Sequence, residues 1–217
     1  MNRFHSPRIV IGLLGALLAL PLGACSSEHA SLCMTSLDEK RDFMQTFDKA
    51  YFRRDAMGDS DLVLVRNVAS TDSNAGQAIN PDGSPAPQQI VHIRIFWKPL
   101  FGTKADHPAN TNASVRWCLI GTGPDAGDFL EYGGSGLVVL DSGHDSATAT
   151  IRTAWMKTVA ARGNMVDPLG PSMLSGQVKA VNDPARVEAL LAELKSASAA
   201  TAINPSDDQP KRFSITP

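Results

Sequence analysis

The stretch IVHIRIFWK, residues 90–98, decides the fold of this chain because apolar and polar side chains alternate along it. Positions 91, 93, 95 and 97 are all apolar, and His92, Arg94 and Lys98 lie between or after them, with Phe96 as the exception. Alternation with a period of two is typical of a β-strand that buries one face. The stretch 114–120 repeats this pattern, so two strong strands are expected on either side of one long connection.

Four further segments have the same strand character. They are apolar, rich in β-branched residues and bounded by turn-forming residues, at positions 62–68, 129–140, 147–159 and 174–181. The link 141–145 between two of them has the composition and length of a hairpin turn. Gly133, Gly134 and Gly136 lie inside the segment 129–140, where they predict a bulge or a point of strong twist rather than a phosphate-binding loop.

A helix is expected at each end of this β-region. Ser36 and Glu39 have the spacing of a capping box, and Phe43, Phe47 and Tyr51 recur every four residues, which predicts a helix over 36–54. Asp183 is the expected cap of a second helix, which has an apolar stripe at Val187, Leu190, Leu191 and Leu194. We therefore expect a mainly β (α+β) domain over 36–195, an antiparallel sandwich or open barrel of about six strands with an N-terminal and a C-terminal helix. Residues 196–217 lack periodicity and are expected to form a disordered tail.

The beginning of the chain has the layout of a secretory signal. Arg3 and Arg8 precede an apolar run over 9–20, which is too short and too interrupted to cross a membrane as a helix. The run ends in Leu22-Gly23-Ala24-Cys25, a sequence that resembles the lipobox of bacterial lipoprotein precursors. The resemblance covers residues 1–25 only.

The lipobox resemblance implies cleavage before Cys25 and lipid attached to that cysteine, usually with acylation of the new amino terminus. Residues 1–24 would then be the signal peptide and 25–35 a tether to the membrane. Two or more acyl chains give stable anchoring, whereas one does not. In such lipoproteins an aspartate after the cysteine marks retention in the inner membrane; Ser26 lies there instead, which favours the outer membrane, facing the periplasm.

Charge excludes one class of partner. The full chain has a net charge of −2, and loss of Arg3 and Arg8 with the signal brings the mature chain to −4. The charges are interspersed, and no basic block is present of the kind that binds nucleic acid. The same pattern gives no support for electrostatic docking on anionic lipid, so the attached lipid is expected to do the tethering.

Cys33 and Cys118 remain in the mature chain besides Cys25. An exported protein meets an oxidising compartment, so this even pair is a candidate disulfide. The alternative is that both are separate buried thiols that behave as small apolar side chains.

No local pattern indicates catalysis, a metal or a cofactor. Histidines and cysteines lack the spacings of a preformed zinc site, and Asp141, Ser142 and His144 are too crowded in one turn to act as a catalytic triad. The least ordinary segment is the connection 97–112, where Lys104, Asp106, His107, Asn110 and Asn112 form a candidate ligand loop. The alternative is a self-satisfying loop in which Asp and Asn side chains bond nearby backbone groups. Residues 164–172 are interpreted as a structural Pro/Gly turn.

Two functional hypotheses follow. The first is a membrane-anchored envelope lipoprotein that acts as a non-catalytic binding or assembly module, held by lipid on Cys25 and with an envelope protein as a candidate partner. The second is a periplasmic enzyme, hydrolase-like, whose site is assembled from separated loops. Neither hypothesis requires a cofactor.

Overall fold

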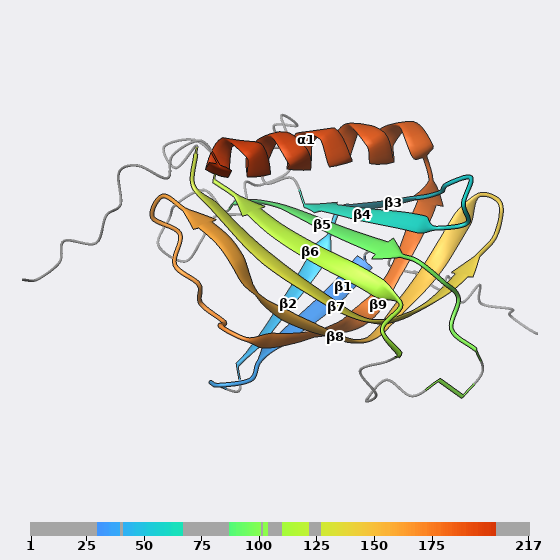
Figure 1. Cartoon of the computed structure of the whole chain (residues 1–217), viewed down its shortest axis with the longest axis horizontal. Coiled ribbons are helices and arrows are strands. Elements are labelled where there is room, and N and C mark those ends of the chain that lie inside the picture. Colours follow the sequence, from blue (N-terminus) through green and yellow to red (C-terminus); the bar gives the residue numbers. More distant parts are fainter. Residues whose placement is uncertain are drawn as a thin grey trace, which may run out of the picture.

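The alternating segments form a nine-stranded sheet followed by one long helix, as a computed structural model of the protein shows (Figure 1). The structure describes residues 30–39, 41–66, 87–100, 102–103, 110–121 and 127–202. The elements in chain order are β1 (Ala30–Ser36), β2 (Asp42–Phe47), β3 (Lys49–Arg54), β4 (Ser60–Arg66), β5 (Gln88–Ile95), β6 (Ala113–Ile120), β7 (Phe129–Ser142), β8 (Ser146–Arg162), β9 (Ser172–Asn182) and α1 (Pro184–Ala202).

Strands β3 to β9 close into a seven-stranded barrel. Each strand from β3 to β9 pairs antiparallel with the next one along the chain. The ring closes where β9 meets β3 in a short parallel pairing of Tyr51 with Val181 and Phe52 with Asn182. The expected mainly β architecture with antiparallel neighbours is therefore confirmed, whereas the expected sandwich or open barrel is not, because the ring of strands is closed.

Strand β9 has a third partner, because the β1–β2 hairpin pairs with its first half. Residues 31–36 of β1 lie antiparallel to residues 172–177 of β9. Gly176 has a φ of 150° at this junction, and a Cβ there would overlap the carbonyl oxygen of Ser31. Glycine permits this close approach of two backbones.

The glycines of β7 lie between two irregularities in its pairing with β8. The β7–β8 register shifts between Glu131 and Tyr132 and again between Leu137 and Val138. Between these shifts, a Cβ on Gly134 would overlap the carbonyl oxygen of Trp155, and one on Gly136 that of Thr153. The register shifts agree with the predicted bulge in this strand, and the glycines allow β7 and β8 to approach closely between them.

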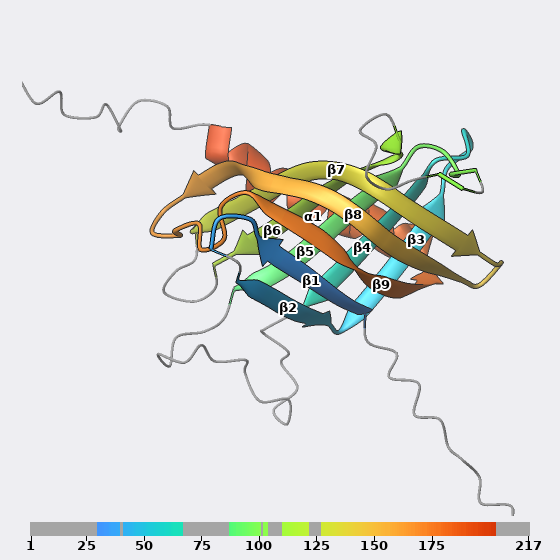
Figure 2. The same ribbon diagram turned by 90° about the horizontal axis from the view of Figure 1, so that it is seen from below.

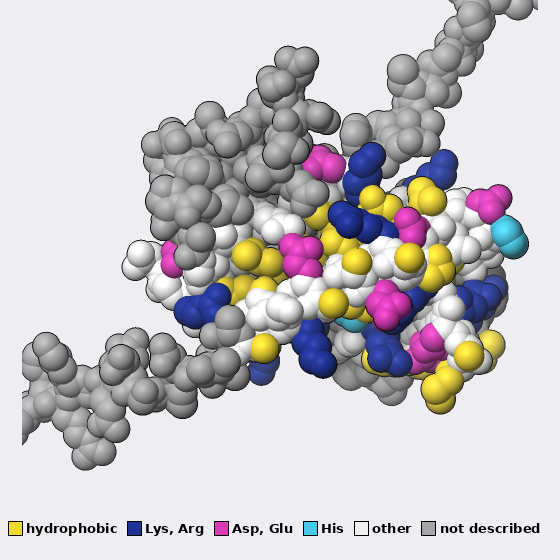
Figure 3. Space-filling model, turned by 90° about the horizontal axis from the view of Figure 1, so that it is seen from above, with side chains coloured by type: hydrophobic (Ala, Val, Ile, Leu, Met, Phe, Trp, Pro, Cys, Tyr) yellow, Lys and Arg dark blue, Asp and Glu magenta, His cyan; other side chains and the backbone are white. Residues whose placement is uncertain are grey.

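Two apolar layers hold the fold together. The larger fills the barrel and includes Trp117, which is fully buried and contacts the ring of Phe47 at 5.6 Å between centroids. The smaller lies between the outer wall of the barrel and α1, where Val187, Leu190 and Leu194 pack on β4, β5 and β6. Seen from the helix side, α1 covers this part of the wall and carries acidic and basic side chains on its outer surface (Figure 3).

The expected C-terminal helix is confirmed, and its start is where the cap predicts. The Asp183 carboxylate accepts a hydrogen bond from the backbone N–H of Arg186 at 2.9 Å, and the Asp183 carbonyl accepts one from Val187 at 3.0 Å. The helix continues to Ala202, so the predicted disordered tail was wrong for residues 196–202. The rest of that tail, 203–217, lies outside the described residues.

The expected N-terminal helix over 36–54 was wrong, because this segment forms β2 and β3. A spacing of four residues fits a strand as well as a helix, since four is a multiple of two. Phe43 and Phe47 both contact Trp117 in the barrel, at 6.0 and 5.6 Å between centroids. Ser36 Oγ does accept the predicted bond from the backbone N–H of Glu39, at 3.3 Å, but in the turn between β1 and β2.

The expected tether over 25–35 was too long. Residues 30–35 belong to β1, a strand between β2 and β9 whose alternate residues Ala30, Leu32 and Met34 are buried. The predicted signal peptide and Cys25 lie outside the described residues.

Candidate functional site

A polar cavity of about 290 Å³ lies at one mouth of the barrel, where three connections meet. The turn after β3, the end of β5 and the end of β7 each contribute to its wall. Arg54, Lys98 and Asp141 supply the charged groups, and Trp97 lies beside Lys98. The full lining is Arg54, Gly58, Ser60, Ile95, Trp97, Lys98, Pro99, Leu140, Asp141 and Ser142.

Two cations of this mouth cavity are not neutralised by an ion pair among the described residues. The Arg54 guanidinium donates to Ser142 Oγ at 2.6 Å, a neutral hydroxyl that fixes its position without cancelling its charge. Lys98 has no ion-pair partner in the described part of the chain. Cations held beside a polar cavity favour an anionic ligand, because charge-assisted hydrogen bonds are about twice as strong as neutral ones.

Carboxylates at the rim are already engaged. Asp55 Oδ1 accepts from the backbone N–H groups of Met57 and Asp59, at 2.9 and 3.0 Å, and so fixes the β3–β4 turn. Asp59 in turn accepts from the Arg94 guanidinium at 3.0 Å. Asp141 is the one carboxylate among the residues that line the cavity, so the lining has a positive balance.

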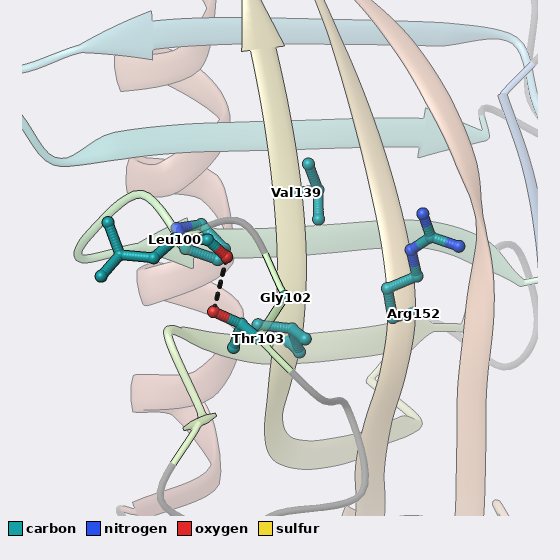
Figure 4. Close-up of a pocket in the computed structure, with 7 residues that line it drawn as sticks. Leu100, Gly102, Thr103, Val139 and Arg152 are labelled. Carbon is teal, nitrogen blue, oxygen red and sulfur yellow. Dashed lines mark hydrogen bonds between the residues drawn. The ribbon is translucent and has the colours of Figure 1, made fainter.

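An apolar groove of about 590 Å³ continues from the mouth cavity across the outer wall of β7 and β8. The two share Pro99. Figure 4 shows Leu100, Gly102 and Thr103 of the connection opposite Val139, with Arg152 farther along the wall. The Thr103 hydroxyl donates to the Leu100 carbonyl at 2.7 Å, which closes the turn that forms the rim.

Among the described residues, apolar side chains of the larger layer pack inside the barrel, where the cavity beside Met34, Trp117 and Tyr132 measures about 30 Å³. The Gln89 side chain links two other buried polar side chains: its Oε1 accepts from the Trp117 indole N–H at 3.2 Å, and its Nε2 donates to Gln45 Oε1 at 3.2 Å. Among the described residues no buried side-chain nitrogen or oxygen lacks a partner. A ligand of this barrel therefore has room at its mouth and outer wall.

An aspartate–histidine pair lies outside the barrel, near α1. Asp61 Oδ1 is 2.9 Å from His92 Nε2, and Asp61 Oδ2 accepts from Arg53 Nε at 3.0 Å. Burial would raise the pKa of Asp61, but hydrogen bonds from His92 and Arg53 outweigh it and lower the pKa below its usual value. Within the described residues no serine or cysteine bonds to the other ring nitrogen of His92, so the pair does not extend to a nucleophile.

The turn 164–172 is structural, as predicted. Asp167 Oδ1 accepts from the Tyr132 hydroxyl at 2.6 Å and from the backbone N–H groups of Leu169 and Gly170, while Oδ2 accepts from Thr158. Burial would raise the pKa of Asp167, but these hydrogen bonds outweigh it and hold the pKa at about 2. Burial and the same carboxylate raise the pKa of Tyr132.

The predicted ligand loop is placed in part. Asn112 is fully buried; its amide donates to the carbonyls of Trp97 and Val138, and its oxygen accepts from the Val138 N–H, all at 2.8 Å. Asn112 therefore fits the alternative reading of a self-satisfying loop rather than a ligand contact. Asn110 is half-buried just before β6. Lys104, Asp106 and His107 lie outside the described residues.

The connection that the sequence singled out borders both cavities, but Arg54 and Arg152 of their linings were not predicted. Residues 97–100, 102 and 103 of that connection contribute to the mouth cavity, the groove or both. Arg54 was missed because its segment was expected to be helical, and Arg152 because nothing in the sequence shows that β8 lies beside the connection.

The predicted disulfide is not formed in the structure, where Cys33 and Cys118 are free thiols. They lie on β1 and β6, which are not neighbours in the sheet. Cys118 packs in the layer under α1, and its burial raises its thiol pKa to about 12. The two cysteines thus correspond to the alternative of separate thiols.

Within the described residues, no cluster of three or more His, Cys, Asp or Glu side chains could hold a metal ion. The helix that the structure describes is not apolar enough over a sufficient length to span a membrane. His144 bonds to its neighbour Asp145 at 2.7 Å and is exposed, while Ser142 accepts from Arg54, so the turn residues Ser142 and His144 do not bond to each other.

Comparison with known proteins identifies no relative: no protein family, curated protein or solved structure matches this chain.

Proposed function

We propose that this chain is a lipid-anchored envelope protein whose barrel binds a small amphiphilic anion without chemical conversion. The anionic head would occupy the mouth cavity beside Arg54 and Lys98, and the apolar tail would lie in the groove past Pro99. The single observation that carries the proposal is this adjacency of a cationic cavity and an apolar groove. Barrel mouths and concave, mostly apolar sites are common places for small ligands.

The anchor rests on the lipobox ending at Cys25, five residues before Ala30 begins β1. Ser26 favours the outer membrane, facing the periplasm. Fatty-acid labelling of cells that make the protein should mark it, and mass spectrometry should find the lipid on Cys25. The Cys25→Ala variant should lose the label, and a Cys25→Ala variant that is labelled as strongly as the wild type would refute the anchor.

Ligand binding is tested with decanoate as the probe. A chain that starts at Ser26 is suitable because both apolar layers lie within residues 30–202. We expect calorimetric binding of decanoate, weaker binding of decanol, which lacks the charge, and weaker binding of acetate, which lacks the tail. Trp97 lines the mouth and should report binding by a change in fluorescence.

Variants of two lysines and an arginine separate the cavity from general charge effects. Arg54→Ala or Lys98→Ala should weaken decanoate binding about tenfold or more, since hydrogen bonds to charged groups contribute about 1.5–3 kcal/mol. Lys49→Ala is the matched control, because Lys49 is exposed at the opposite end of β3 from Arg54. Equal affinities for decanoate and decanol, or equal losses in all three variants, would refute the proposed site.

An assembly role is the second candidate, favoured by exposed apolar side chains around the same mouth. Met57 is 89% exposed, Leu100 82% and Phe96 47%. Crosslinking of the native protein in its envelope, beside a Cys25→Ala control, should then yield one reproducible protein partner that the control loses. Absence of such a partner would leave ligand binding as the function to pursue.

A further inference from the structure

The outer face of β8 and β9 has an unusual composition. Together the two strands carry four basic residues, Arg152, Lys157, Arg162 and Lys179, and no acidic residue. This occurs in a chain whose net charge is −2. In Figure 2 these strands lie in front with β1 and β7, and α1 lies behind them on the opposite side of the barrel. We refer to the exposed surface around Arg152, Trp155, Lys157 and Lys179 as the β8–β9 face.

Cations on the β8–β9 face lack the ion pairs that cations on the helix side have. On the helix side, Arg53, Arg94 and Arg116 each contact a carboxylate within 3.0 Å. Lys157 and Lys179 are exposed, and neither has an ion-pair partner among the described residues. The two strands carry no carboxylate of their own, and acidic residues lie at the margins of the face: Asp141 is two strands from Lys179, Asp42 is three strands from Trp155, and Asp145 lies in the turn before β8.

Large apolar side chains lie among these cations. Trp155 is 58% exposed, Val159 53% and Val181 59%. Trp155 is two residues from Lys157 on the same strand, so both side chains point outward. An exposed tryptophan flanked by cations is typical of surfaces that meet the interface between lipid headgroups and water.

The beginning of the described chain brings this face close to the proposed anchor. Ser31 on β1 pairs with Gln177 on β9, so the chain enters the fold at the edge of the β8–β9 face. Cys25 precedes Ala30 by five residues, which span at most about 18 Å when extended. A lipid on Cys25 would therefore hold the edge of this face within about 18 Å of the membrane.

From these observations we propose that the β8–β9 face rests on the surface of an anionic phospholipid membrane, with Trp155 at the level of the headgroups. The orientation rests on the proposed lipid anchor, which brings the face to the membrane. It revises the expectation from the linear sequence that charge gives no support for docking on anionic lipid, because folding gathers cations that are dispersed along the chain. The helix side and α1 then point away from the membrane.

Binding to vesicles tests this surface without the anchor. A chain that starts at Ser26 carries no lipid, so its partitioning does not depend on acylation of Cys25. We expect it to bind vesicles of phosphatidylglycerol and phosphatidylethanolamine, to bind phosphatidylcholine vesicles weakly, and to be released by high salt. Trp155 fluorescence should shift to the blue and be quenched by brominated phospholipid, and the Trp155→Phe variant should lose that quenching.

Two pairs of substitutions that remove equal charge make the test specific. Lys157→Ala with Lys179→Ala should lower partitioning into anionic vesicles about 25-fold, since each cation near an anionic surface contributes about fivefold. Arg186→Ala with Lys195→Ala removes two exposed cations from α1. This pair should change partitioning into anionic vesicles less than about twofold, because α1 is proposed to face away from the membrane. Arg54, Lys98 and Arg152 stay unchanged, so the ligand site is left intact.

The outcomes separate this proposal from the proposed function. Equal losses in the two double variants, or no partitioning at low salt, would overturn the membrane face while leaving decanoate binding and Cys25 acylation to their own tests. Partitioning that depends on Lys157 and Lys179 in a chain that binds no decanoate would instead support the face and refute the ligand site.

Discussion

Asn112 provides the sharpest test of whether the connection 97–112 is held by its own side chains. Replacing Asn112 with alanine leaves the N–H and carbonyl of Val138 and the carbonyl of Trp97 without their partner, and the two bonds to Val138 are buried. Each unsatisfied buried group costs about 1–3 kcal/mol, so the two buried groups of Val138 alone predict a fall of about 2–6 kcal/mol in the free energy of unfolding. That is a large part of the roughly 5–15 kcal/mol that stabilises a typical domain.

Urea unfolding of Asn112→Ala, followed by circular dichroism, measures this loss directly. The midpoint should fall while the slope stays constant, since the variant exposes the same surface on unfolding. The Asn112→Asp variant keeps the acceptor for the Val138 N–H but loses both donors, so it should be destabilised as well. Ser135→Ala, at an exposed position on β7, should change the free energy by less than about 0.5 kcal/mol. A loss below about 1 kcal/mol in Asn112→Ala, together with weaker ligand binding, would refute the structural role.

Three further predictions concern the barrel wall and its thiols. Asp167 has a folded-state pKa of about 2 against a usual 3.8, so its hydrogen bonds stabilise the fold above about pH 4, and this stabilisation is lost as pH falls toward 2. Urea unfolding across this range should show a falling free energy of unfolding, and the Asp167→Asn variant should show a weaker dependence on pH. Gly134→Ala should cost about 3 kcal/mol in unfolding free energy because its Cβ overlaps the backbone of β8, whereas Gly143→Ala, whose Cβ meets nothing nearer than 3.5 Å, should be nearly neutral. In the unreduced chain, a thiol reagent should label Cys33 in the folded state and Cys118 only after unfolding, and no labelling of the unfolded chain would reinstate the disulfide.

The strands with alternating or continuous apolar character were predictable from the sequence. All six expected strands are present. A sheet with one buried face requires apolar residues at every second position, and this alternation is visible in the sequence. The segment 36–54 was not predictable in this way. Its aromatic residues recur at a spacing common to helix and strand, and only the contact of Phe43 and Phe47 with Trp117 decides between them.

The candidate site was predictable only in outline. The connection 97–112 carries a visible excess of polar residues and prolines between two strong strands. Within it, Trp97, Lys98 and Pro99 line the mouth cavity, and Pro99, Leu100, Gly102 and Thr103 line the groove. Arg54 and Arg152 reach the same region from strands far away in the chain. Their positions follow from strand pairings, of β3 with β4 and β4 with β5 for Arg54 and of β8 with β7 for Arg152, and these pairings leave no local pattern in the sequence.

Strand β9 pairs with β1, β3 and β8, and these pairings determine when the domain can fold during its synthesis. Ser31 finds its partner Gln177 only after nearly all of the domain has been synthesised, and the barrel closes at Asn182. Contacts of such long sequence separation form slowly. A nascent chain with this topology stays open for as long as its last strand is missing, and an open chain is what the export that we propose would require.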